Sequence, residues 1–282
     1  MKLTTKSLIG CVTLGALLLT TAPTAYAING VAPGDDAHTE GRVDFVYESD
    51  DANPVDPLDP TPKPITPVNP GPNPGTKGVL RIDLAPNVVF KDVVVSGTDQ
   101  TSFAKAVEYN VTDGNEQRFS PNFLQVTDIR GNKFGWKVSA QASNLMKYDK
   151  DTNGNLTTVI PGSEVVGAKL TFKQPTILSK SGVDTTVAAL TPSSTDVVLD
   201  LNTVTAGSAS MPMLDATIST AEPTKGYGIW TALYAPESQT HIPAADAAAY
   251  ENENISLFIP ASAHKSAGSY KADITWTMEE TP

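Results

Sequence analysis

A short polar segment that begins at Asp149 has the composition of a calcium-binding loop. Asp149, Asp151 and Asn153 place oxygen donors at alternate positions, and Gly154 stands where such a loop bends. The twelfth position is Ile160, where a calcium loop needs a bidentate carboxylate. Segments rich in Asp, Asn and Gly are also ordinary hairpin turns. We expect a turn here, and calcium bound by the three oxygen donors is the alternative.

Catalytic chemistry finds less support in the sequence. The three histidines, His38, His241 and His264, are far apart, and no nucleophile signature surrounds the serines near His264. No group of residues has the spacing of zinc ligands. Two carboxylates that cleave a glycoside meet in space rather than in sequence, so that alternative stays open. We expect a protein that is not an enzyme and uses no cofactor.

Residues 1–27 are typical of a secretory signal peptide. Two lysines precede an apolar run that is too short to span a bilayer permanently, and Ala25-Tyr26-Ala27 forms a small-x-small cleavage site. Cys11 lies early in the apolar run, whereas a lipid-modified cysteine follows such a run, so we interpret it as part of the signal. Cleavage after Ala27 removes this one cysteine, and the mature chain then has no disulfide.

The mature chain is acidic. The whole chain has a net charge of −11 at pH 7, and the loss of the two lysines of the signal makes this about −13. Without a cluster of basic residues there is no footprint for phosphates, so nucleic acid is not an expected partner. We find no transmembrane segment in the mature chain and no C-terminal sorting signal. We therefore expect a secreted, extracellular protein that stays at the cell surface by binding something there.

Residues 28–77 form an acidic, proline-rich stretch. Nine prolines fall between Pro54 and Pro74, and such a run favours polyproline II and does not pack a core. We interpret it as a spacer or long surface loop, with a docking ligand for an aromatic-lined groove as the alternative. Ahead of the prolines, the alternation of residues 42–47 indicates one strand.

From residue 78 onward the sequence predicts an all-β domain. Short segments rich in Val, Ile, Thr and aromatic residues recur between clusters of Gly, Pro, Asn and Asp. Many strands at this spacing predict a two-sheet β-sandwich or barrel-like domain over residues 78–282. The expected strands are 79–84, 88–95, 106–111, 124–129, 134–142, 165–172, 197–201, 228–234, 255–259 and 270–278, and residues 244–250 are expected to form a turn or two of helix.

Two tryptophan-bearing segments of this domain echo each other. Because successive side chains of a strand point to opposite faces, Trp136 shares a face with Val138. In the same way Tyr270, Trp276 and Met278 share a face. Each tryptophan and the apolar residue two positions later therefore point in the same direction.

These segments carry a resemblance to a known family. Trp-x-aliphatic at Trp136, followed near the C-terminus by Gly-x-Tyr-x-x-x-x-x-Trp-Thr-Met and a closing Pro, is similar to the WxL-domain cell-surface proteins of low-GC Gram-positive bacteria. The similar region runs from about residue 78 to the C-terminus, with a start at Arg42 as the alternative. The sequence departs from the family at the namesake position, since Val138 and Met278 replace Leu. Both are apolar, and Met is close to Leu in volume, so packing is expected to survive.

The resemblance implies non-covalent attachment to the cell wall through peptidoglycan. It also implies assembly with other surface proteins, including a membrane-anchored protein that interacts with this domain. The alternative function is that of a structural or adhesive subunit, held at the surface by another surface protein or by host matrix. The resemblance points to Trp136, Val138, Trp276, Met278 and Tyr270 as the residues that bind peptidoglycan or a partner.

The role of the two tryptophans has two interpretations. Exposed aromatic rings suit sugar rings and peptides, so Trp136 and Trp276 would form or frame a platform. The apolar faces on which they lie are also typical of a buried stripe, in which case both rings belong to the core. The motif strands would then support a site formed by loops.

Overall fold

The computed structural model describes residues 42–46, 51–71, 75–131, 134–201, 208–219, 225–236 and 238–282. The predicted signal peptide lies outside these residues. The chain divides into two units, Met1–Val46 and Tyr47–Pro282. In the first unit, residues 42–46 are exposed and form no strand, although the sequence indicated one at 42–47. No described helix is both long enough and apolar enough to cross a membrane.

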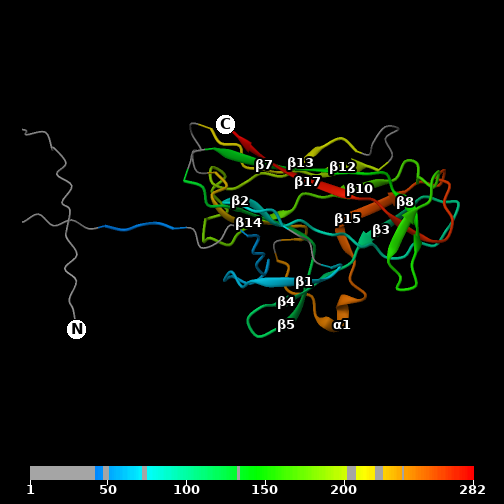
Figure 1. Cartoon of the computed structure of the whole chain (residues 1–282), viewed down its shortest axis with the longest axis horizontal. Helices are drawn as coiled ribbons and strands as arrows, with labels where there is room; N and C mark the ends of the chain where they lie inside the picture. Colours follow the sequence, from blue (N-terminus) through cyan, green and yellow to red (C-terminus); the bar gives the residue numbers. More distant parts are fainter. Residues whose placement is uncertain are drawn as a thin grey trace, which may run out of the picture. The chain divides into compact units, whose positions relative to one another are not determined.

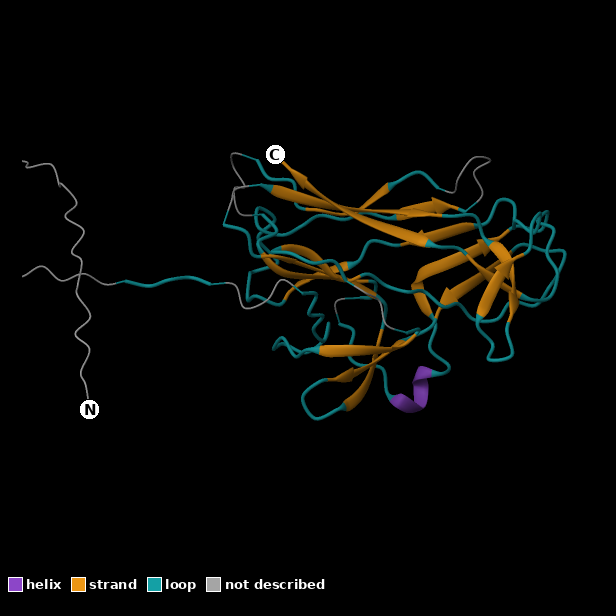
Figure 2. Ribbon diagram, in the orientation of Figure 1, coloured by secondary structure: helices purple, strands orange, loops and turns teal. Residues whose placement is uncertain are grey.

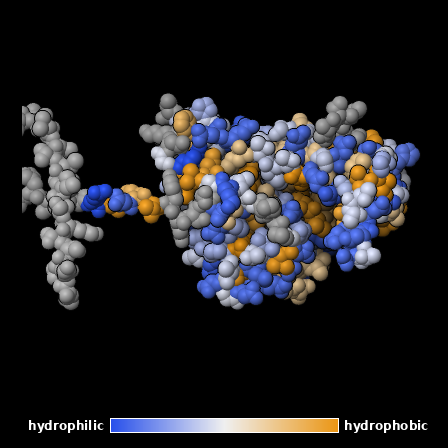
Figure 3. All heavy atoms as spheres, viewed as in Figure 1, coloured by the Kyte–Doolittle hydropathy of each residue, from blue (hydrophilic) through white to orange (hydrophobic). Residues whose placement is uncertain are grey.

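The second unit is almost entirely β, as predicted, and Figures 1 and 2 show its strands together with one short helix. Polar residues cover most of the face seen in Figure 3, with smaller apolar areas between them. The elements are β1 (Ile65–Asn69), β2 (Leu80–Leu84), β3 (Gln100–Ala104), β4 (Val107–Val111), β5 (Glu116–Ser120), β6 (Phe123–Asp128), β7 (Gly135–Ala142), β8 (Met146–Lys150), β9 (Leu156–Val159), β10 (Lys169–Phe172), β11 (Thr176–Ser179), β12 (Val197–Asp200), β13 (Met211–Asp215), β14 (Gly228–Leu233), α1 (Ala244–Ala247), β15 (Asn252–Ile259), β16 (Ser269–Lys271) and β17 (Ile274–Thr281).

The strands form five antiparallel sheets, more than the two that the sequence led us to expect. The five sheets are named B to F. Sheet B has the strand order β1-β4-β5, sheet C the order β11-β14-β6-β2 and sheet D the order β12-β10-β15-β3; sheet E has the order β13-β7-β17 and sheet F the order β16-β8-β9. Most strands have only four to six residues, and register shifts interrupt several pairs. Short, interrupted strands bend and twist, which divides the layers into smaller sheets.

Two cores lie on either side of sheet C. The larger core joins sheet C to sheets D and E, and it includes Trp230, Phe172 and Val138. The smaller core joins the other face of sheet C to sheet B, through residues such as Phe123 and Tyr109. All six residues of β6 are buried because this strand has a packed layer on both faces. Figure 1 shows this arrangement, with β7 and β17 at the top, β2 and β14 in the middle and β1, β4 and β5 below.

The proline-rich segment is part of this packing rather than a spacer. Ile65 is buried and β1 pairs antiparallel with β4, although Pro67 lies within it. Pro67 is tolerated because β1 is the edge of sheet B, where a missing N–H costs no ladder hydrogen bond on the open side. The backbone of Val55 exchanges hydrogen bonds with the Gln125 side chain, at 2.7 and 3.1 Å. Residues 51–71 therefore cover sheet C instead of leading away from it.

The strands with clear alternation were predicted well, and the less regular ones were not. The segment 88–95 has no strand and makes only one isolated bridge, between Phe90 and Ala104. The predicted strand 270–278 is two strands, β16 and β17, in different sheets. Seven strands had no counterpart in the prediction, namely β1, β3, β5, β8, β9, β11 and β13. The predicted helical turn at 244–250 is α1.

Candidate functional site

The two tryptophan motifs lie on neighbouring strands. β7 is the central strand of sheet E and β17 pairs antiparallel with it over eight residues without a register shift. Trp276 lies opposite Ala140, and Met278 lies opposite Val138. Directly opposite residues share a face of the sheet, so the apolar faces of the two motifs form one surface. Segments that are far apart in the sequence thus build one side of the larger core.

The first motif is completely buried. Trp136 and Val138 are both 0 % exposed. The indole Nε1 of Trp136 donates a hydrogen bond to the carbonyl oxygen of Gly226, at 3.1 Å, so its polar atom is satisfied inside the protein. Gly226 has a φ of +77°, and a Cβ there would lie 2.8 Å from that indole nitrogen. The site is built around the ring, and Trp136 offers no surface to a ligand.

The second motif is only partly covered. Trp276, Met278 and Tyr270 each keep part of their surface exposed while packing against the larger core. The ring of Trp276 meets that of Phe172 in sheet D at an edge-on angle of 79°, with 6.1 Å between the centroids. The Tyr270 hydroxyl is bound by the backbone of Ser266, at 3.1 Å. Of the residues that the resemblance singled out, these three are the ones that a partner can reach.

The calcium-like segment is a hairpin turn between β8 and β9, as expected. Asp151 Oδ1 accepts hydrogen bonds from the backbone N–H groups of Asn153 and Asn155, at 2.9 and 2.8 Å. Its Oδ2 accepts one from the Asn155 amide at 3.0 Å. These hydrogen bonds lower the pKa of Asp151 from its usual value. The oxygens that a cation would need are therefore used by the turn, and no described group of three or more His, Cys, Asp or Glu residues could hold a metal.

Neither of the two described histidines, His241 and His264, is hydrogen-bonded to another histidine. His38 lies outside the described residues, and His264 is exposed on the turn before β16. His241 contacts Asp56 through Nε2, at 2.9 and 3.0 Å from the two carboxylate oxygens. A histidine beside a carboxylate is one half of a catalytic arrangement, but no described serine or cysteine contacts the ring.

Asp56 instead centres a polar cluster that ties the proline-rich segment to sheet B. Its carboxylate is fully buried and accepts hydrogen bonds from the Tyr109 hydroxyl at 3.0 Å and from Arg118 Nη1 at 2.8 Å. Burial alone would raise the pKa of Asp56, but the hydrogen bonds from His241, the Leu58 N–H and Arg118 outweigh it and lower this pKa. Burial, with the charge of Asp56 next in importance, raises the pKa of Tyr109. The cluster is a structural clamp.

Lys63 and Lys180 extend the clamp to Asp59. The Lys63 ammonium lies 2.7 Å from the Asp59 carboxylate, and this hydrogen bond is the main reason why the pKa of Asp59 is lowered. Lys180 Nζ donates to the backbone oxygen of Asp59 at 2.7 Å, and burial lowers the pKa of this lysine. No sequence pattern predicted the clamp, because its members come from four segments that are far apart along the chain.

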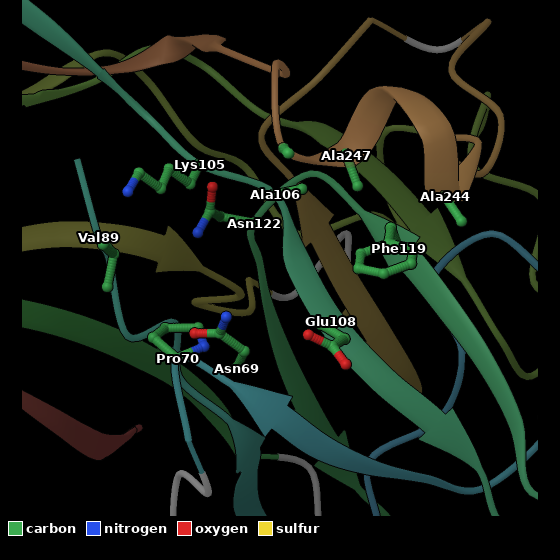
Figure 4. A pocket seen from close by; sticks show the side chains of 11 residues that line it. Asn69, Pro70, Val89, Lys105, Ala106, Glu108, Phe119, Asn122, Ala244 and Ala247 are labelled. Atoms are coloured by element: carbon green, nitrogen blue, oxygen red, sulfur yellow. The ribbon is translucent and has the colours of Figure 1, made fainter. Parts of the chain in front are cut away.

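A hollow of about 410 Å³ lies beside the clamp, between α1 and the ends of β1 and β4. Figure 4 shows Asn69 and Asn122 on one side of it, with Glu108 and Phe119 on the other. Alanines of α1 close one wall, and Lys105 stands at the rim. No sequence motif indicated these residues, because they come from several separate segments of the chain. They offer amides, a carboxylate, an ammonium and an aromatic ring around one space.

Several polar atoms of the hollow keep bonding capacity. Asn122 is buried, and its Oδ1 accepts a hydrogen bond from Asn252 at 3.2 Å. Glu108 Oε1 accepts one from the Gln117 amide at 2.6 Å, which fixes the carboxylate and leaves its other oxygen for a ligand. Such an arrangement of fixed polar groups in a partly apolar recess is typical of small-ligand sites.

Comparison with known proteins identifies the family. The sequence profile described as "WxL domain surface cell wall-binding" matches residues 32–282. The match includes both tryptophan motifs and also residues 51–71 of the proline-rich stretch, which pack against sheets B and C. Comparison with curated proteins and with solved structures returned no match. The chain belongs to the family of WxL domains, which are surface cell wall-binding domains.

Proposed function

We propose that this protein is exported and attaches to the cell wall non-covalently, by binding peptidoglycan directly. The observation that carries the proposal is the family match, which covers nearly the whole chain and describes a cell wall-binding domain. The signal-like N-terminus supports export. The role is that of a binding protein rather than an enzyme.

The hollow beside α1 is the proposed contact for the wall polymer. Peptidoglycan consists of N-acetylated amino sugars that carry short peptides, so it presents hydroxyls, amides, carboxylates and amines. The amides of Asn69 and Asn122 match hydroxyl and acetamido groups, and the free oxygen of Glu108 accepts from a hydroxyl or an amine. The ring of Phe119 supplies an apolar face for a sugar. A volume of about 410 Å³ suits one or two sugar rings rather than a long polymer.

The motif strands support this function indirectly. Trp136 and Val138 are wholly buried, so they hold sheet E on the larger core. This supports the interpretation in which the motifs stabilise the domain and loops elsewhere make the contact. Trp276 and Met278 of β17 remain partly accessible, and Figure 1 shows β17 near the top of the view and α1, which lines the hollow, near the bottom.

A sedimentation assay with purified, protein-free sacculi tests the proposal. The mature protein should sediment with the sacculi, and Phe119→Ala and Glu108→Gln should each weaken binding by about tenfold, equivalent to about 1.4 kcal/mol. Tyr227→Ala is the matched aromatic control, since Tyr227 is 53 % exposed and lies outside the hollow. Folded protein that stays in the supernatant would refute direct wall binding. A fall in the turbidity of the suspension would instead reveal a wall hydrolase.

The second candidate function is retention through another surface protein. The partly exposed apolar face of β17 favours it, because such a face has capacity for a further contact. The same assay separates the two functions. Bare sacculi retain the protein under the first function, whereas retention requires an added surface protein under the second.

A further inference from the structure

β17 is an open edge of sheet E. It pairs with β7 on one side, and no described strand pairs with it on the other. Over Ile274–Thr281, alternate N–H and C=O groups therefore point away from the sheet without a strand partner among the described residues. Eight residues of regular extended backbone are enough to receive a whole additional strand.

β17 is the longest edge strand among the described residues, whereas most of the other edges are short or interrupted: β2 and β3 carry register shifts, β5 has five residues, β9 has four and β16 has three. Native edge strands avoid pairing with foreign chains by being short or by carrying proline, bulges or lysine. β13 contains Pro212 and a register shift, β1 contains Pro67 and a register shift, and β11 and β12 have four residues each. β17 is long, its pairing with β7 is unbroken, and it holds neither proline nor lysine.

The side chains of β17 describe the strand that would pair with it. Ile274, Trp276 and Met278 point towards the larger core but remain partly exposed, while the alternate residues face solvent. An added strand with apolar side chains on the core side would complete their cover. Trp276 packs on Phe172 of β10, and sheet D continues past β10 with β15 and β3, which leaves a neighbouring layer for the added strand to rest on.

Charge decides between a second copy and another protein. Of the three acidic side chains in residues 271–282, Asp273 pairs with Lys271 at 2.9 Å and Glu280 pairs with Arg130. Glu279 is then the acidic side chain of β17 without an ion pair among the described residues, and the whole chain has a net charge of −11. Glu279 is exposed on the solvent face of the strand. Two copies that met through this edge would bring like charges together, which is unfavourable across a strand pair, whereas a basic strand is attracted.

We propose that the open edge of β17 receives an extended, basic segment of another protein as a fourth strand of sheet E. The segment alternates apolar residues, which face the larger core beside Trp276, with lysine, arginine or threonine, which face solvent beside Glu279. Main-chain hydrogen bonds provide affinity, and the alternating side chains provide specificity. The inference specifies the surface for the second candidate function above and is independent of wall binding at the hollow.

Disulfide trapping tests the edge directly. The chain has one cysteine, in the predicted signal, so the mature protein accepts a single engineered one. The probe is a ten-residue peptide that alternates isoleucine with lysine and carries a central cysteine. In a buffer of oxidised and reduced glutathione, in which the oxidised form accepts the two electrons and is released as reduced thiol, Thr277→Cys on β17 should form the mixed disulfide with the peptide. Hydrogen exchange of residues 274–281 should slow when the peptide is bound. Val198→Cys is the matched control, since it lies exposed on the four-residue edge strand β12 and should remain unreacted.

Variants of the peptide and of the protein fix the mode of binding. A peptide with two central prolines should form no mixed disulfide, because proline cannot donate the main-chain hydrogen bonds. Glu279→Lys should weaken the binding of the lysine peptide about threefold to tenfold relative to the binding of a peptide with glutamate in place of lysine. This magnitude follows from the energy of cross-strand charge pairs. Glu253→Lys on β15 is the charge control and should leave both peptides unchanged. Equal trapping at positions 277 and 198, trapping of the proline peptide, or no trapping at all would overturn the proposal.

Two further outcomes distinguish a partner strand at β17 from a second copy of the chain and from the wall polymer. A homodimer linked through Thr277→Cys in the absence of peptide would assign the edge to a second copy and overturn the proposal. Bare sacculi should retain Thr277→Cys and Glu279→Lys as well as the unchanged protein. Loss of sacculus binding in these variants would assign the edge to the wall polymer, and loss in the hollow variants alone leaves the edge proposal intact.

Discussion

Replacing Asp56 by Asn tests whether the polar clamp holds the proline-rich segment on the domain. The Asp56 carboxylate has no solvent exposure, and it is hydrogen-bonded to Tyr109, Arg118 and His241 at distances between 2.8 and 3.0 Å. Asparagine has nearly the same shape but offers one acceptor oxygen and no charge. The change therefore removes the charge and half of the acceptor capacity while it preserves the packing.

The expected loss in the free energy of unfolding is about 3 kcal/mol at pH 7. Removing one partner of a buried ion pair costs about 3–5 kcal/mol, because the other charge is left without compensation. Arg118 still forms ion pairs with Glu116 at 2.7 Å and with Asp59 at 3.3 Å, so its charge remains compensated. The loss of unfolding free energy therefore lies at the lower end of this range. Asp113→Asn, an exposed change in the turn between β4 and β5, should alter stability by less than about 0.5 kcal/mol.

The pH dependence gives the prediction its sharpest form. The native carboxyl of Asp56 has a lowered pKa, so it stays ionised to a lower pH than the same carboxyl in the unfolded chain. The unfolded state therefore binds more protons in acid, and the contribution of Asp56 is present above the unfolded pKa of about 3.9 and is lost as the pH falls. In urea titrations, the difference between the unchanged protein and Asp56→Asn should shrink steadily from about pH 5 to pH 3. A difference that is constant over this range, or smaller than about 0.5 kcal/mol at pH 7, would refute the reasoning.

Three further predictions concern the motifs and the hairpin. Trp136→Ala should cost about 3–5 kcal/mol in urea titrations and Trp276→Ala about 2 kcal/mol, because only the first ring is fully buried; equal losses would contradict that difference. Gly226→Ala should lower the melting temperature through a loss of about 1–3 kcal/mol, because its Cβ would lie 2.4 Å from that of Ala216, and an unchanged melting temperature would show that the strain is relieved. Millimolar calcium should leave the melting temperature unchanged, because the turn already uses both oxygens of Asp151; a rise that EDTA reverses would establish a calcium site.

The parts of the fold that the sequence predicts are those with a local cause. Residues 255–259 are a short run rich in apolar and branched side chains, which predicts a strand, and in β15 Ile255, Leu257 and Ile259 are buried while the two residues between them are only partly buried. The shared face of Trp136 and Val138 follows from the same period of two. These features depend on the residues of one strand and on nothing distant.

The proline-rich segment shows why the rest was not predictable. Its composition indicates an extended chain without a core, and among residues 51–71 only Ile65–Asn69 form a strand. Its packing, however, depends on Gln125, Tyr109 and Arg118, which lie more than fifty residues away along the chain. Composition describes the conformation of a segment, but long-range polar partners decide whether that conformation is docked or free. The hollow was missed for the same reason.

The two tryptophan motifs show, within one sheet, that the same local pattern can be buried or partly exposed. Both have the same alternation, yet Val138 is fully buried and Met278 is partly exposed, because β7 is central and β17 is at the edge. The residues that replace Leu suit these two positions. A central site surrounded by fixed neighbours accepts the compact, rigid Val, whereas an edge site keeps the flexible, unbranched Met, which adapts to whatever packs on it. If β17 receives a partner strand, Met278 is therefore the side chain expected to change rotamer on binding, while Val138 keeps its position.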